Sequence, residues 1–67
     1  MAYMRYSRHA RERMVERGIS ESEVRTALQK GRKRAQNGKI IATYSYFEVV
    51  YKIIENDPYI ITIKPRW

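Results

Sequence analysis

The chain has 67 residues, which is enough for one domain, and we expect a single domain over residues 1–67. It holds no cysteine and one histidine, so neither a disulfide framework nor a metal site is expected. Fourteen Lys and Arg residues stand against seven Asp and Glu residues, a net charge of +7. This excess of positive charge favours binding to polyanions, so we expect a nucleic-acid partner. We expect no cofactor.

The sequence offers no sign of a membrane segment. No apolar run approaches the roughly 18 residues that a spanning helix needs. The first residues, 1–5, lack the hydrophobic core of a signal peptide. We therefore expect a soluble cytoplasmic protein that makes no membrane contact.

The first predicted element is a helix over residues 8–17. Ser7 is a suitable N-cap, and Gly18 stands where a left-handed residue ends many helices. Ile19 follows, in the position from which it can pack back on Met14.

A second helix is predicted to begin after Ser20 and to end at Gly31. Ser20 and Glu23 have the spacing of a capping box. Ile19 and Val24 flank the same boundary as a hydrophobic staple, so Ile19 should be buried. The expected buried face consists of Val24, Ala27 and Leu28.

After Gly31 the pattern indicates strands, over residues 32–36, 39–44, 47–55 and 59–64. Asn37-Gly38 predicts a type I′ hairpin turn, and residues 56–58 predict another turn. The link between the second and third strands has no Gly or Pro, and its turn is not apparent. The last two strands should lie centrally in the sheet because both of their faces are apolar. The fold class is α+β, with two N-terminal helices packed on a three- to four-stranded antiparallel sheet.

His9, Arg13 and Arg17 are spaced by four residues and should share one face of the first helix. An imidazole beside guanidinium groups could act as a base near a bound phosphate. The alternative role is structural: His9 bonds a backbone carbonyl, and the arginines pair with Glu12, Glu16 or residues of the sheet. In either role, we expect the three side chains to form one connected polar cluster at the edge of the sheet, near the C-terminal strand.

Two further features bear on nucleic-acid binding. The run Arg32-Lys33-Arg34 can form a ridge that contacts phosphates, or can be a solvated run at the end of the second helix. Six tyrosines and Trp67 include residues that could stack on unpaired bases, although tyrosine is also an ordinary strand residue.

The segment from His9 to Ser20 resembles a family of small prokaryotic domains of unknown function that opens with H-A-x-x-R-M-x-x-R-G-I-S. The resemblance extends to the strand pair that contains Val49-Val50-Tyr51-Lys52 and Ile60 to Pro65. That family is grouped with the RelE/ParE-like toxins, which implies two helices on an antiparallel sheet.

The resemblance also implies candidate site residues. RNA-cleaving toxins of the group use basic residues and a tyrosine on the sheet to contact messenger RNA, whereas ParE-like members act on gyrase. The resemblance thus makes Tyr51, Lys64 and Arg66 candidates. With His9 and Arg13, which come from the spacing on the first helix, they are the candidate catalytic residues. The candidate nucleic-acid-binding residues come from charge and spacing and are Arg17, Arg32, Lys33 and Arg34.

Three functional hypotheses remain open at this point. The chain can be a RelE-like toxin that cleaves RNA, with Arg13, Lys64 or Arg66 stabilising charge on the phosphate. It can be a non-catalytic RNA- or DNA-binding module that uses the same surface. It can also be an interaction domain whose basic charge meets an acidic antitoxin-like protein.

Overall fold

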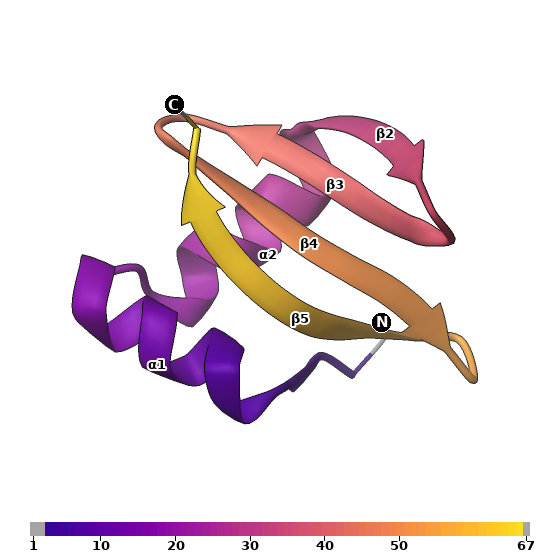
Figure 1. Ribbon diagram of the computed structural model, residues 1–67, viewed down its shortest axis with the longest axis horizontal. Coiled ribbons are helices and arrows are strands. Elements are labelled where there is room, and N and C mark those ends of the chain that lie inside the picture. The colour runs from indigo at the N-terminus through magenta and orange to yellow at the C-terminus, as the bar shows by residue number, and fades with distance from the viewer. Residues whose placement is uncertain (1–2, 67) are drawn as a thin grey trace.

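A computed structural model of the chain describes residues 3–66, and Trp67 lies outside them. These described residues form two helices and five strands (Figure 1). In chain order these are β1 (Arg5–Tyr6), α1 (Arg8–Arg17), α2 (Glu21–Lys30), β2 (Arg32–Gln36), β3 (Lys39–Tyr44), β4 (Phe47–Ile54) and β5 (Asp57–Pro65). The strands form one sheet in the order β1-β5-β4-β3-β2.

The sheet is larger than the sequence predicts, and it is mixed. Strands β2 to β5 pair as antiparallel neighbours, as expected. The unpredicted strand β1 pairs in parallel with β5, with Arg5 opposite Tyr59. Two residues carry too little periodicity to predict a strand, so only the pairing with a distant segment defines β1.

Helix α1 has the predicted bounds, and its ends follow from local hydrogen bonds. The Ser7 side chain accepts a hydrogen bond from the backbone N–H of Ala10, 3.0 Å away. At the other end Gly18 has φ 65°. The N–H of Ile19 donates to the carbonyl of Met14 at 2.9 Å, which is the long bond of a Schellman motif.

Helix α2 begins with the predicted capping box. The Ser20 N–H donates to the Glu23 carboxylate at 2.9 Å, and the Glu23 N–H donates to the Ser20 hydroxyl at 3.2 Å. The helix ends at Gly31, whose φ of −70° is open to any residue. Glycine is required there for space, because a Cβ would lie 2.5 Å from the carbonyl oxygen of Ala27.

Three two-residue turns connect β2 to β5. Asn37 and Gly38 have φ values of 52° and 77°, which confirms the type I′ prediction. Residues 45–46 form the turn that the sequence did not reveal, with Ser45 at φ 55°. The turn predicted over residues 56–58 is misplaced: it consists of residues 55–56, and Pro58 is a buried residue of β5.

Both helices pack on one face of the sheet, α1 against β5 and α2 against β3 and β4. In Figure 1, α2 passes behind β4. The core between the layers contains Ala10, Met14, Ile19, Val24, Ala27, Ala42, Phe47, Val49, Tyr51, Ile60 and Ile63. Ile19 is buried as predicted, while Leu28 is only half-buried against this core. Within residues 3–66, no helix has the length and apolar character needed to cross a bilayer.

Candidate nucleic-acid interface

Within residues 3–66 no helix covers the second face of the sheet, and we call this the open face. Residues that pair across antiparallel strands point to the same side of a sheet. The register therefore aligns one row of side chains on the open face, composed of Arg32, Thr43, Glu48 and Lys64. A parallel row contains Arg34, Ile41, Val50 and Thr62, and Lys39, Lys52 and Tyr59 lie further along the same face.

Charge is divided unequally between the two sides of the molecule. Four of the seven acidic residues, Glu12, Glu16, Glu21 and Glu23, lie on the helices. Three of these form ion pairs there, Glu12 with Arg8, Glu21 with Arg11, and Glu16 with Arg13. The open face has five Lys and Arg residues on its strands, with Glu48 among them and Asp57 at its far end. The helices carry six Lys and Arg residues against four acidic ones, a net charge of +2. The open face has five basic residues on its strands and Arg66 beside them against two acidic ones, a net charge of +4, so the positive field is stronger there.

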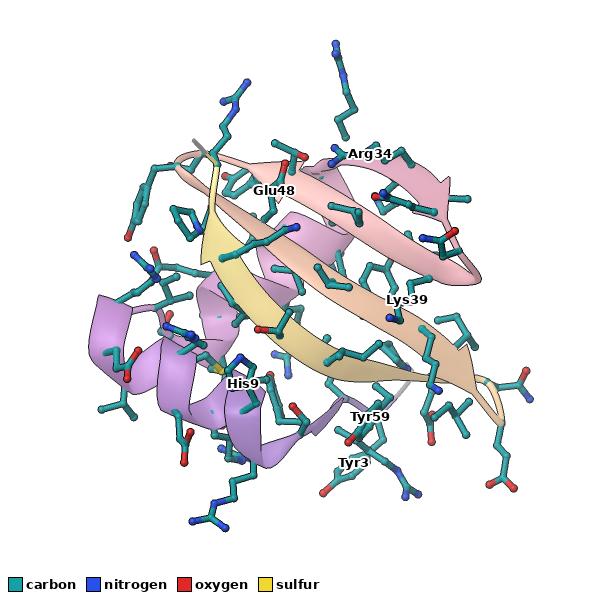
Figure 2. The ribbon with its side chains drawn as sticks, in the orientation of Figure 1. Tyr3, His9, Arg34, Lys39, Glu48 and Tyr59 are labelled. Carbon is teal, nitrogen blue, oxygen red and sulfur yellow. The ribbon has the colours of Figure 1, made fainter. Side chains whose placement is uncertain are left out.

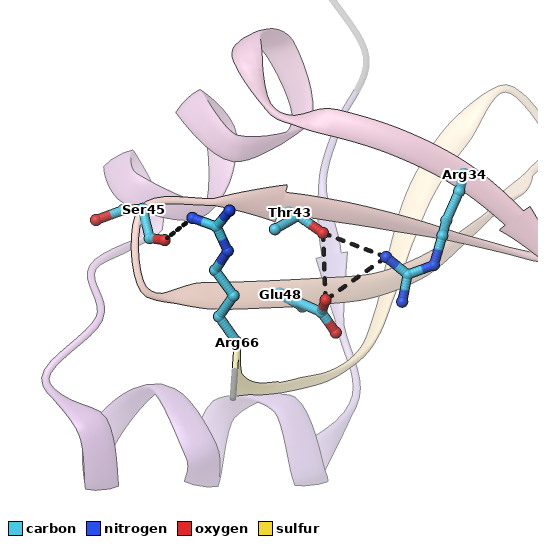
Figure 3. A network of polar contacts seen from close by, with 5 residues as sticks. All are labelled: Arg34, Thr43, Ser45, Glu48 and Arg66. Carbon is cyan, nitrogen blue, oxygen red and sulfur yellow. Dashed lines mark hydrogen bonds and ion pairs between the residues drawn. The ribbon is translucent and has the colours of Figure 1, made fainter.

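Arg34, Thr43 and Glu48 form a polar network on this face (Figure 3). The Thr43 hydroxyl donates to Oε2 of Glu48 at 3.2 Å and accepts from Nη1 of Arg34 at 3.4 Å. The same Arg34 nitrogen lies 3.6 Å from Oε2. The Glu48 side chain is 12% exposed and that of Arg34 is 53% exposed. The carboxylate is thus held in place while the guanidinium remains open to a ligand.

Arg66 borders this network from the end of β5. Its Nη1 donates to the carbonyl of Ser45 at 3.0 Å, which fixes the guanidinium over the β3–β4 turn (Figure 3). A depression of about 430 Å³ lies here, lined by Arg32, Arg34, Thr43, Glu48 and Arg66, and we call it the arginine pocket. A second depression, of about 210 Å³, lies on the same face beside Lys39 and Lys64.

The structure separates the predicted candidates instead of gathering them. Four of them lie on or beside the open face, namely Arg32, Arg34, Lys64 and Arg66. Lys33 alternates to the other face, since it pairs with the buried residue Ala42. The three-residue basic run is therefore not one ridge.

The predicted cluster on α1 forms only in part. Nε of Arg13 donates to Nε2 of His9 at 3.4 Å, and Nη1 of Arg13 pairs with Glu16 at 3.2 Å. Arg17 is exposed in the last turn of α1 and takes no part in these contacts. His9 lies on α1 beside β5, whereas Arg34 and Glu48 lie across the sheet on β2 and β4 (Figure 2). The Glu16 contact matches the structural alternative for this motif.

The tyrosine that the resemblance singled out lies in the core. Tyr51 is 5% exposed, on the side of the sheet that the helices cover. Burial raises the pKa of its hydroxyl above the ordinary value of about 10. Because it is buried on the helix-covered side, Tyr51 does not reach a ligand on the open face. Tyr59, which pairs with Lys52, occupies the open face and is half-buried.

Thr43 and Glu48 were missed as candidates. The Asn37-Gly38 turn fixes Gln36 opposite Lys39, and counting outward from it would have placed Arg32 opposite Thr43. Placing Glu48 requires the second turn as well, at residues 45–46, which has no glycine to reveal it. Among residues 3–66, no three His, Cys, Asp or Glu side chains gather in a way that could hold a metal ion.

Comparisons with known proteins bear on the family and on the fold. A family model described as a domain of unknown function, DUF4258, matches residues 6–64. No curated protein matches the chain. The structure is similar to a chain in the crystal structure of the RelBE2 toxin–antitoxin complex from Mycobacterium tuberculosis, with a TM-score of 0.62. The two are 15% identical, and the alignment covers 97% of this chain and 98% of that chain, so the likeness shows a shared fold.

Proposed function

The chain belongs to the DUF4258 family of domains of unknown function, and we propose that it binds single-stranded RNA on its open face, as a protein of the RelE-like toxin type. The observation that carries this proposal is the basic, helix-free sheet face with its arginine pocket. Arginine side chains suit this role because their planar forks bind phosphate oxygens in pairs.

Three features of the face support RNA as the ligand. Arg34 and Arg66 flank the pocket, with room between them for a phosphate or a base. Lys64 and Lys39 continue the positive charge along the sheet. Tyr59 offers a ring next to Lys52 on which an unpaired base can stack. Unpaired nucleotides expose both phosphates and bases to such a surface, whereas duplex RNA hides its base edges.

The arrangement supports binding more directly than cleavage. A catalytic set must converge on one reacting phosphate. His9 and Arg13 lie on α1, Tyr51 lies in the core, and Lys64 and Arg66 lie at the open face. These five residues therefore do not form one site.

A second candidate function is association with an acidic, antitoxin-like protein. The specific observation in its favour is that the structurally similar chain comes from a toxin–antitoxin complex. Such a partner would meet the same positive charge as RNA does. Competition between an acidic peptide and RNA would show whether both ligands use the open face.

The proposal is tested with a pair of variants on one strand. Arg34 and Lys33 are neighbours on β2 that face opposite sides of the sheet, and both are exposed. Arg34→Ala and Lys33→Ala remove the same charge, so Lys33→Ala is the matched control. Affinity for oligouridine RNA is measured by fluorescence anisotropy over a range of salt concentrations.

Arg34→Ala should weaken binding more than Lys33→Ala does. It should also reduce the slope of log K against log salt by about 0.7, the share of one phosphate contact on a single strand. Equal effects of the two substitutions would show that total charge and not the open face determines binding. Undetectable binding by the unmodified protein at low salt would refute the RNA proposal and favour the acidic protein partner.

A further inference from the structure

The arginine pocket contains the carboxylate of Glu48. A site that binds only phosphate is not expected to contain a negative charge. Glu48 lies between Thr43 and Lys64 in the row that crosses the sheet. With its side chain 12% exposed, it is surrounded by the other residues that line the pocket. A negative charge at this point repels phosphate, so it lowers the affinity of the pocket for a bare RNA backbone.

The contacts within the protein use only part of the hydrogen-bonding capacity of this carboxylate. Thr43 and Arg34 both approach Oε2. A carboxylate can accept about four hydrogen bonds through its two oxygens. The hydrogen bonds found within residues 3–66 leave Oε1 of Glu48 to solvent or to a ligand. Because the ion pair with Arg34 is long, at 3.6 Å and partly exposed, it gives little reason for the acid to be there.

A ligand that suits this pocket must offer donors to Glu48 and an acceptor to Arg34, side by side. The Watson–Crick edge of guanine has this pattern, with O6 as an acceptor next to the N1–H and N2–H donors. Adenine and cytosine each place a single amino donor beside a ring acceptor, and uracil has one N–H between two carbonyls. Guanine is therefore the base whose edge gives a carboxylate two adjacent donors.

We propose that the arginine pocket selects an unpaired guanine in the bound RNA. Glu48 accepts hydrogen bonds from N1–H and N2–H, Arg34 donates to O6, and Arg32, Lys64 and Arg66 hold the neighbouring phosphates. The volume of about 430 Å³ falls within the range of roughly 300–1,000 Å³ that is typical of small-ligand sites. This inference rests on the proposed RNA binding and adds base preference to it.

The experiment compares short RNAs that differ only at a central nucleotide flanked by uridines. The central base is guanine, inosine, adenine, cytosine or uracil, and affinity is measured by fluorescence anisotropy. The unmodified protein should bind the guanine RNA about tenfold or more tightly than the adenine, cytosine and uracil RNAs. Inosine, which lacks the N2 amino group, should lose part of this advantage.

Two protein variants assign the preference to a residue. In Glu48→Gln the amide replaces one acceptor by a donor, so the preference for guanine should disappear. Affinity for oligouridine should rise in this variant, because the negative charge that repels phosphate leaves the pocket. Glu55→Gln removes the same charge at the exposed β4–β5 turn and should keep the preference.

The outcomes separate this inference from the proposed function. Equal affinity for all five RNAs would overturn the guanine site and leave RNA binding standing. No binding to any of them would overturn both. A guanine preference that survives in Glu48→Gln would show that another residue reads the base. If Glu48→Gln fails to fold, the inference is tested on the unmodified protein by comparing its affinities for the inosine and guanine RNAs. Equal affinity for these two RNAs would overturn the role of the two donors.

Discussion

Gly31→Ala tests how closely the end of α2 is joined to the sheet. The φ of −70° at Gly31 suits alanine, so any effect must come from space. A Cβ at this position would lie 2.5 Å from the carbonyl oxygen of Ala27 and 2.9 Å from that of Thr43. Both oxygens belong to the backbone of packed elements, so neither can turn away as a side chain could.

The expected magnitude follows from this geometry. Non-bonded heavy atoms are most stable at about 3.5–4 Å. The last turn of α2 must therefore open by about 1 Å between Gly31 and the Ala27 carbonyl, and β3 must move by about 0.6 Å from Gly31 at Thr43. Overpacking of this kind costs about 1–3 kcal/mol. The lower entropy of alanine in the unfolded chain offsets about 0.4–1 kcal/mol. We expect a net loss of about 1–2 kcal/mol, from a total of about 3–10 kcal/mol for a domain of this length.

The assay is urea denaturation followed by circular dichroism, together with a thermal melt. For a domain of this size each kcal/mol corresponds to about 4–8 °C in Tm. The slope of unfolding free energy against urea should not change, because the variant exposes nearly the same surface on unfolding. An unchanged or higher unfolding free energy in Gly31→Ala would refute the close packing of Gly31 against the carbonyl oxygens of Ala27 and Thr43. The change in unfolding free energy would then come only from the lower entropy of the unfolded chain with alanine.

Two further predictions concern groups that the sequence singled out. His9→Ala should change stability by less than about 0.5 kcal/mol and leave RNA affinity unaltered, because His9 is exposed and its contact with Arg13 is long. Loss of RNA binding in a His9→Ala protein with an unchanged Tm would instead place α1 in the binding site. Tyr51 has a pKa raised by burial, so its contribution to stability is complete below about pH 10 and is lost as the pH rises through its folded-state value. Tyr51→Phe should therefore flatten the decline in unfolding free energy above pH 10, and an equally steep decline in the variant would contradict this assignment.

The elements whose causes are local could be predicted from the amino-acid sequence. Ser7, Gly18 and the pair Ser20 and Glu23 define helix ends through hydrogen bonds within a few residues, and the structure shows these bonds. The Asn37-Gly38 turn likewise depends on backbone angles that these two residue types tolerate. Such signals can be found in the sequence because the interacting groups are close neighbours in the chain.

Other features came only from the tertiary structure. Strand β1 exists because Arg5 and Tyr6 pair with residues more than fifty positions away. The turn at residues 45–46 places a non-glycine residue, Ser45, at φ 55°, a conformation that the flanking strands impose. The burial of Tyr51 depends on which face of the sheet the helices cover, and strand periodicity alone does not fix this choice.

The candidate site likewise has features that the sequence predicts and features that only the structure reveals. The charge of +7 points to a polyanion through composition alone. The alternation of β2 separates Lys33 from Arg34, and the register across three strands brings Arg34, Thr43 and Glu48 together. A one-residue shift in either turn would send these side chains to opposite faces. Composition thus indicates the kind of ligand, whereas the pocket that would hold it depends on strand register, which is set by contacts between segments distant in the chain.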